Sequence, residues 1–245
     1  MKSLFILFFT FLSFFNVYSQ NTKDSLVELI IQKNGGRRNL ESLKSLHIKS
    51  YSISSLSSQD TALNHYYVNK DNKFIHIGEY KTYISKLGYN GKESWYRKYD
   101  KKTLDTMPSF IRRNIHKADF GKKKSFIGIF NMLILMDAYS LKENISIEYD
   151  KKIKEEKCLI IRIITKDSEE YDFFIHPESH RIIAISYTKD KYESFTSYED
   201  YRKVQNIYYP FKSYTELAKS TSYEIIKEIQ INPTISESVF EPPQK

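Results

Sequence analysis

Over most of its length beyond residue 46, the chain of 245 residues alternates apolar and polar side chains with a period of two. Two clear examples are residues 145–150 and 223–231. Comparable runs occupy residues 47–56, 63–69, 73–78, 82–89, 93–98, 157–165, 170–176, 181–188, 192–204 and 207–218. This period is typical of strands that pack one face on apolar groups and turn the other face toward water.

The arrangement of these runs constrains the fold class. Five runs precede residue 100 and seven follow residue 140, with almost no helical periodicity inside either group. Alternating βαβ units, which build parallel sheets, are therefore excluded. Aromatic residues make up 15% of the chain and suit a pleated, half-buried surface. We predict a mainly β (α+β) fold: a single strongly curved antiparallel sheet, an open half-barrel of about 11 strands, with helices covering the concave face.

Turn residues separate the runs. Asn90-Gly91 is the strongest hairpin signal, because both residues tolerate positive φ. Further turns are expected at residues 69–72, 166–168 and 176–179, which are rich in Asn, Asp, Ser or Pro. No repeat, linker or low-complexity tract divides the chain, so residues 20–245 are expected to form a single domain.

Three segments have helical features instead. Residues 24–33 carry apolar side chains on one helical face, and the glycines at 35–36 are a strong stop signal. A short second turn is expected at residues 40–44. An insert at about residues 107–140 includes the run 126–136, which is apolar at almost every position. That run is too short to cross a bilayer, and a helix that is apolar all round is usually buried on several sides.

Residues 1–19 have the layout of a secretory signal peptide. Lys2 supplies a positive start, residues 4–15 are strongly apolar, and small or modest side chains precede Gln20. The alternative is an uncleaved membrane anchor, but an apolar run of about 12 residues is short against the roughly 20 that a spanning helix needs. The residue directly after the predicted cleavage point is Gln20, not the Cys that would carry a lipid anchor. We therefore expect an exported, periplasmic protein that is not lipid-anchored.

Several motifs occur in an order that is typical of one family. They are the predicted N-terminal helix with residues 33–36 and 40–46, an Asn-Gly hairpin with Trp at 89–95, paired strands at 171–183, a strand pair at 197–210, and Phe240-Glu241-Pro242-Pro243. Together these motifs resemble the LolA/LolB-like outer-membrane lipoprotein-sorting family of periplasmic lipoprotein carriers. The turn at 176–179 departs from the family pattern, as does Asn206, which stands where the family has a glycine.

The resemblance implies a half-barrel with a helical lid, the insert at about 107–140, over an apolar cavity that takes acyl chains. We therefore predict a monomeric, non-enzymatic carrier or binding protein for lipid or lipoprotein acyl chains, which moves or holds hydrophobic cargo in the cell envelope. The alternative is an envelope sensor or assembly factor that binds a protein partner with the same fold. A carrier must provide apolar lining, because each methylene gains about 0.8 kcal/mol on leaving water.

Two sets of residues are candidates for the site. The predicted ligand-binding set combines large apolar side chains of the insert with the hairpin tryptophan: Phe110, Ile111, Ile115, Phe126, Ile127, Phe130, Leu133, Ile134, Met136 and Trp95. The alternative is ordinary core packing, since both roles require burial; for Trp95 packing is the first interpretation. The predicted membrane-facing set is basic and would contact anionic lipid headgroups: Arg112, Arg113, Lys117, Lys122, Lys123 and Lys124. Here the alternative is a solvated face.

Other functions find little support. One Cys, Cys158, can form neither an internal disulfide nor a Cys-based zinc site, and its apolar run makes it a poor nucleophile. The loop from His176 to His180 lacks a known metal-ligand spacing. No hydrolase, zinc-protease or phosphate-binding motif is present, so we expect no cofactor, no metal and no enzymatic activity. The net charge of +8 would suit nucleic acid, but the export signal and the lack of a recognition motif argue against that partner.

Overall fold

The computed structural model describes residues 24–55, 61–71, 73–107, 132, 135–136, 139, 144–153, 156–166, 168–190, 192–217 and 220–243. The predicted signal peptide lies outside these residues, as does most of the predicted insert. None of the helices in the described ranges has both the length and the apolar character needed to cross a membrane.

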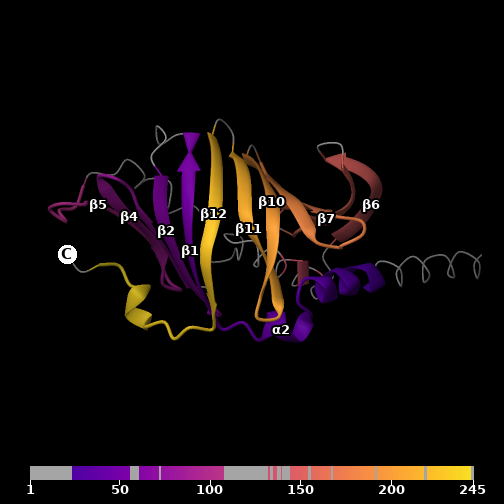
Figure 1. Cartoon of the computed structure of the whole chain (residues 1–245), viewed down its shortest axis with the longest axis horizontal. Coiled ribbons are helices and arrows are strands. Elements are labelled where there is room, and N and C mark those ends of the chain that lie inside the picture. Colours follow the sequence, from indigo (N-terminus) through magenta and orange to yellow (C-terminus); the bar gives the residue numbers. More distant parts are fainter. Residues whose placement is uncertain are drawn as a thin grey trace, which may run out of the picture.

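Within the described ranges, twelve strands form one antiparallel sheet in the order β5-β4-β3-β2-β1-β12-β11-β10-β9-β8-β7-β6 (Figure 1). The strands are β1 (Ser45–Ser54), β2 (Thr61–Asn69), β3 (Phe74–Glu79), β4 (Tyr83–Tyr89), β5 (Ser94–Asp100), β6 (Asn144–Ile153), β7 (Glu156–Ile164), β8 (Glu170–Ile175), β9 (Ile182–Lys189), β10 (Tyr192–Val204), β11 (Ile207–Leu217) and β12 (Ser220–Ile231). The prediction of a mainly β fold with one large antiparallel sheet is confirmed.

Each described strand is adjacent to the next one in sequence, except that β5 and β6 are not neighbours. β1 pairs with β12, so the first and last strands meet in the middle (Figure 1). β5 and β6 lie at opposite edges, so the chain between residues 101 and 143 joins one edge of the sheet to the other. Five strands precede this connection and seven follow it, in the order that the alternating runs predicted.

Residues 24–33 are helical, as predicted, and this helix ends at two glycines with positive φ, Gly35 at 138° and Gly36 at 79°. Gly35 also approaches β11 so closely that a Cβ there would lie 3.1 Å from the Cα of Ile207. Only glycine combines this conformation with this contact. The second helix, α2 (Arg37–Glu41), begins slightly before the turn predicted at residues 40–44.

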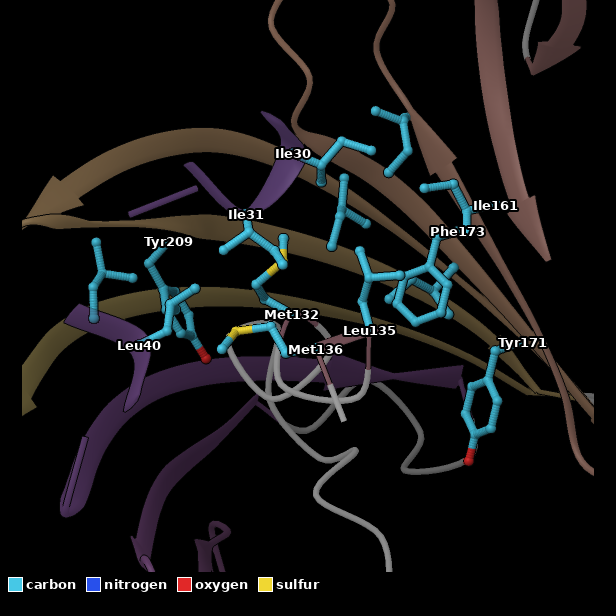
Figure 2. Packing of buried hydrophobic residues seen from close by; sticks show 14 of the residues in the cluster. Ile30, Ile31, Leu40, Met132, Leu135, Met136, Ile161, Tyr171, Phe173 and Tyr209 are labelled. Carbon is cyan, nitrogen blue, oxygen red and sulfur yellow. The ribbon is translucent and has the colours of Figure 1, made fainter. Parts of the chain in front are cut away.

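The main hydrophobic core lies between the first helix and the sheet. Val27, Ile30 and Ile31 of residues 24–33 pack in one cluster with strand residues such as Leu46 and Phe173. Figure 2 shows the ribbons of the sheet curving around this cluster. We call the face of the sheet that carries the cluster the inner face and the opposite one the outer face. Directly opposed residues of neighbouring strands share a face, so the strand registers assign each strand residue to one face.

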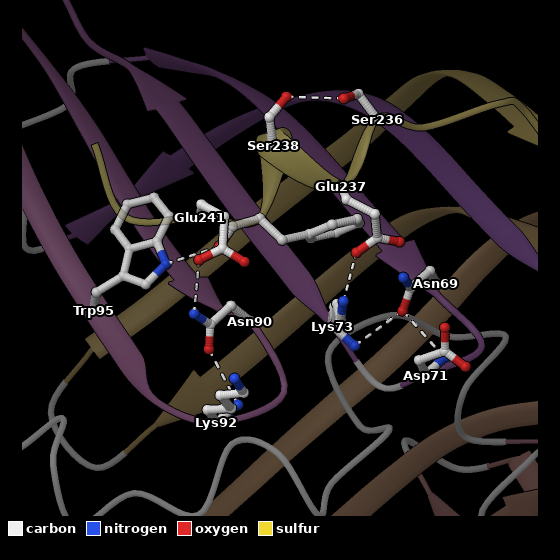
Figure 3. A network of polar contacts seen from close by, with 11 residues as sticks. Asn69, Asp71, Lys73, Asn90, Lys92, Trp95, Ser236, Glu237, Ser238 and Glu241 are labelled. Carbon is white, nitrogen blue, oxygen red and sulfur yellow. Dashed lines mark hydrogen bonds and ion pairs between the residues drawn. The ribbon is translucent and has the colours of Figure 1, made fainter. Parts of the chain in front are cut away.

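The segment after β12 packs on the outer face. It contains the 3-10 helix η5 (Glu237–Val239) and the fully buried Phe240, which forms a second, small cluster with Ile75 and Trp95. The indole N–H of Trp95 donates a hydrogen bond to the carbonyl oxygen of Phe240 at 3.0 Å. Figure 3 shows this bond among the polar contacts around the segment. The C-terminal segment thus packs against the outer face of β3 to β5.

Candidate functional site

One part of the inner face is packed with apolar side chains of the chain itself. Met132, Leu135 and Met136 lie in the same cluster as the helix at residues 24–33 and the inner residues of β7, β8, β9 and β11 (Figure 2). Other buried members are Leu40, Ile48, Ile161, Ile163, Tyr171, Ile175, Ile182, Ile185, Ile207, Tyr209 and Phe211. Met136 is 4% exposed, and its surroundings are those of a core residue.

A second part of the inner face is polar. Along β1, the apolar residues Leu46 and Ile48 are followed on the same face by Ser50 and Ser52. Neighbouring strands add further polar groups in register with them. We call the connected side chains the polar network: Ser50, Ser52, Asn64, Tyr66, His76 and Glu224.

Glu224 on β12 is the charged member of the polar network. The hydroxyl of Ser50 donates a hydrogen bond to its Oε1, and the hydroxyl of Tyr66 donates a second to the same atom at 2.9 Å. Burial raises the pKa of Glu224 above its usual value, and these two hydrogen bonds act in the opposite direction. Among the described residues Glu224 has no ion-pair partner.

His76 on β3 is the neutral base of the polar network. Its Nε2 lies 2.9 Å from Oδ1 of Asn64, and because an amide oxygen only accepts, Nε2 carries the proton. The amide nitrogen of Asn64 donates in turn to Oγ of Ser52 at 2.8 Å. Burial lowers the pKa of His76 to about 4, so this imidazole is uncharged at neutral pH.

Tyr66 contacts both Glu224 and His76 and so connects the two sides of the polar network. Its ring stacks on that of His76 with centroids 4.6 Å apart and planes 9° from parallel. Burial, followed by the nearby charge of Glu224, raises the pKa of Tyr66 well above 10, so the phenol remains a hydrogen-bond donor. The network therefore presents one carboxylate that accepts hydrogen bonds from two neutral hydroxyl groups.

No family model and no curated protein sequence matches this chain. Several solved structures resemble it over most of its length, and two of them are described next. A DUF1329 family protein from Desulfovibrio piger superposes with a TM-score of 0.53 and 9% identity, covering 89% of this chain and 96% of that chain. A LolA superfamily protein from Nitrosomonas europaea superposes with a TM-score of 0.51 and 9% identity, covering 88% of this chain and 97% of that chain. The fold is LolA-like.

The LolA-like fold confirms the resemblance that the ordered motifs indicated. At 9% identity the likeness to the two solved structures concerns the fold alone. The motif-bearing segments have distinct places in it: the Asn-Gly hairpin joins β4 to β5, and the ending that includes Phe240 packs on the outer face.

Most of the predicted ligand-binding and membrane-facing residues lie outside the described part of the chain. Those outside the described residues are Phe110, Ile111, Ile115, Phe126, Ile127, Phe130, Leu133 and Ile134 of the apolar set, and Arg112, Arg113, Lys117, Lys122, Lys123 and Lys124 of the basic set. Their roles stay predictions. Met136 lies on the inner face, in the packed cluster.

Trp95 lies on the face of the sheet opposite to the packed cluster, in agreement with the packing interpretation. It pairs across strands with Gly88, and the register continues through Ile75 to Tyr67, which has the opposite orientation to its inner-face neighbour Tyr66. The indole therefore lies on the outer face, 6% exposed beneath the C-terminal segment. Its role is packing, and it is separated from the inner face by the sheet itself.

The other residues singled out for chemistry have structural roles. Cys158 is 1% exposed, and burial raises the pKa of its thiol, which makes it a weak nucleophile. Nδ1 of His176 accepts hydrogen bonds from the backbone N–H groups of Glu178 and Ser179 at 3.3 and 3.1 Å, which closes the hairpin turn. Within the described ranges no group of three or more His, Cys, Asp or Glu side chains is arranged to hold a metal ion.

Sequence reasoning missed the place of Glu224 in the polar network because a β-bulge inverts the alternation of β12. Lys49 faces Glu228 while Ser50 faces Ile226, so Lys227 is an extra residue in the register. Before the bulge, even-numbered positions such as 224 turn inward, whereas after it odd-numbered positions such as 229 do. The adjacent isoleucines at 225–226 interrupt strict alternation and were the available signal.

Proposed function

We propose that this protein is an exported, non-enzymatic carrier that binds the acyl chains of lipids or lipoproteins on the inner face of its sheet. The observation that carries the proposal is the LolA-like fold, together with apolar side chains on the inner face of β3 to β5 that lie outside the packed cluster. In this proposal residues 1–19 direct export to the periplasm, and the mature protein is a monomer without a lipid anchor. The insert at about 107–140 supplies the lid, and its basic residues contact anionic lipid.

The inner face of β3 to β5 is where we place the acyl chain. Phe74, Leu87 and Tyr96 lie there in register with the inner face of β2, and none of them belongs to the cluster under the first helix. Leu87 and Tyr96 are only half-buried. A bound chain would cover them and remove its own methylenes from water, with a gain of about 0.8 kcal/mol for each methylene.

The first test is to look for cargo that the protein already holds. The protein is purified from the periplasm without detergent, and native mass spectrometry and solvent extraction identify any bound amphiphile. In parallel, the uncharged fluorescent probe N-phenyl-1-naphthylamine reports on apolar binding. We expect a co-purified amphiphile and saturable probe binding. The absence of both would refute the carrier proposal.

A matched pair of variants locates the site. Leu87 and Lys86 are adjacent on β4 and face opposite sides of the sheet, since Lys86 is in register with Ile77 of the outer cluster. Leu87→Gln should weaken probe binding about tenfold, which corresponds to about 1.4 kcal/mol of lost apolar contact. Lys86→Gln should leave probe binding unchanged. Equal effects of the two variants would contradict a site on the inner face.

The alternative function, an envelope sensor or assembly factor with a protein partner, has one observation in its favour. Tyr51, Ile53 and Tyr223 lie together on the outer face of β1 and β12 with 41%, 48% and 36% of their surfaces exposed. Exposed apolar groups of this kind mark interaction surfaces when they are contiguous. A pull-down that yields a stoichiometric protein, with no bound lipid, would favour this function over the carrier.

A further inference from the structure

The carboxylate of Glu224 has an unequal set of partners. Both of its hydrogen bonds, from Ser50 and Tyr66, end on Oε1. Within the described part of the chain, Oε2 accepts no hydrogen bond and faces no cationic side chain. A half-buried carboxylate without a counter-ion is unfavourable, because it has lost part of its hydration and has gained no opposite charge.

The surroundings of Glu224 connect it to the face on which we place the acyl chain. Tyr66, which donates to Glu224, stacks on His76, and His76 is directly opposite Leu87 in the register of β3 and β4. Tyr96 continues the same row on β5. From β12 to β4 this path crosses four inter-strand spacings, or about 19 Å along the sheet. A molecule with an apolar chain and a polar head can lie along it.

We propose that Glu224 is the counter-ion for the ammonium head of a chain-bearing amphiphile held on the inner face. The inference rests on the proposed carrier function and specifies the chemical class of its cargo. An ammonium group brings both the positive charge and the N–H donors that Oε2 lacks. A carboxylate head would meet a like charge instead. A divalent metal ion is a poor alternative, since such ions take several oxygen ligands and the polar network has one carboxylate.

Competition between matched probes tests the head-group preference. Dodecylamine and dodecanoate carry chains of the same length and opposite charges, and each is titrated against bound N-phenyl-1-naphthylamine at pH 7. We expect dodecylamine to displace the naphthylamine at a concentration at least tenfold lower than dodecanoate. Butylamine has the head without the chain, and we expect it to displace nothing over the same range.

Two substitutions assign the preference to Glu224. Glu224→Gln keeps an acceptor for Ser50 and Tyr66 but removes the charge, and it should bring the two probes to within about twofold of each other. Glu228→Gln removes a carboxylate from the outer face of the same strand and should preserve the tenfold preference. If Glu224→Gln does not fold, Tyr66→Phe removes one donor and leaves the charge, so the preference for the amine should persist or increase.

The outcomes separate this inference from the carrier function. Equal displacement of the fluorescent probe by dodecylamine and dodecanoate in the unmodified protein would overturn the counter-ion role. So would an unchanged preference for dodecylamine in Glu224→Gln. Both results would leave the carrier function intact. A loss of the preference in Tyr66→Phe would also overturn the counter-ion role. Displacement by butylamine as effective as that by dodecylamine would show a site for soluble amines and refute the amphiphile. Failure of the protein to bind the naphthylamine, with no co-purified amphiphile, would refute the carrier function itself.

Discussion

Replacing Gly88 by alanine tests whether Trp95 anchors the C-terminal segment to the outer face. A Cβ at Gly88 would lie 2.5 Å from both Cε2 and Cζ2 of the indole and 2.8 Å from its Nε1. The indole has little freedom to avoid this contact, because it is 6% exposed and hydrogen-bonded to the carbonyl oxygen of Phe240. Figure 3 shows the indole beside the C-terminal segment.

The expected cost follows from this geometry. Ordinary carbon–carbon contact requires about 3.5 Å or more, so the indole must shift by about 1 Å. Overpacking of this kind costs about 1–3 kcal/mol, and loss of the bond from Trp95 to Phe240 adds about 1 kcal/mol. An alanine that causes no clash would instead stabilise a strand by up to about 1 kcal/mol, because it restricts the unfolded chain. We therefore expect Gly88→Ala to lower the free energy of unfolding by about 1–3 kcal/mol.

Because the chain contains one Trp, tryptophan fluorescence reports on this site alone. Urea unfolding gives the free-energy change, and the native emission maximum should move to longer wavelength as the indole becomes exposed to water. Trp95→Leu supplies the control through a double-mutant cycle followed by circular dichroism. The cost of Gly88→Ala should fall by more than half in that background. A Gly88→Ala protein as stable as the parent, with unshifted emission, would refute the reasoning.

Three further predictions concern the inner face. Burial lowers the pKa of His76 from 6.5 to about 4. The stability that its neutral form contributes is therefore complete above pH 6.5 and is lost as the pH falls toward 4, a total of about 3 kcal/mol. In urea unfolding over this pH range, His76→Gln should lose correspondingly less stability than the parent. Glu224 has a raised pKa, so its ionised form destabilises the fold at high pH; Glu224→Gln should therefore gain stability relative to the parent between pH 4 and pH 8, and a constant difference would contradict this. Leu135 is fully buried, so Leu135→Ala should cost about 2–5 kcal/mol in thermal unfolding, whereas Leu29→Ala, at a residue 38% exposed, should change stability by less than about 0.5 kcal/mol.

Local patterns predicted the elements well because their causes are local. Alternation with a period of two requires only that each strand have one buried face, and it located strands on both sides of the insert. The helix at residues 24–33 and its end at Gly35 could also be predicted from the sequence, because the tolerance of positive φ is a property of glycine itself. These signals were sufficient for the fold class and for the resemblance to the LolA-like family.

The sequence by itself thus determined one antiparallel sheet, its N-terminal helix, and the order of five strands, an insert and seven strands. Only the tertiary structure decided that β1 pairs with β12, that Trp95 lies on the outer face, and that Glu224 lies on the inner one. The physical reason is that alternation separates two faces without saying which one is inner, and that the extra residue Lys227 inverts the alternation within a single strand. The side of the sheet on which a side chain lies depends on the register between strands that are far apart in sequence. That register is fixed only when those strands contact one another in the fold.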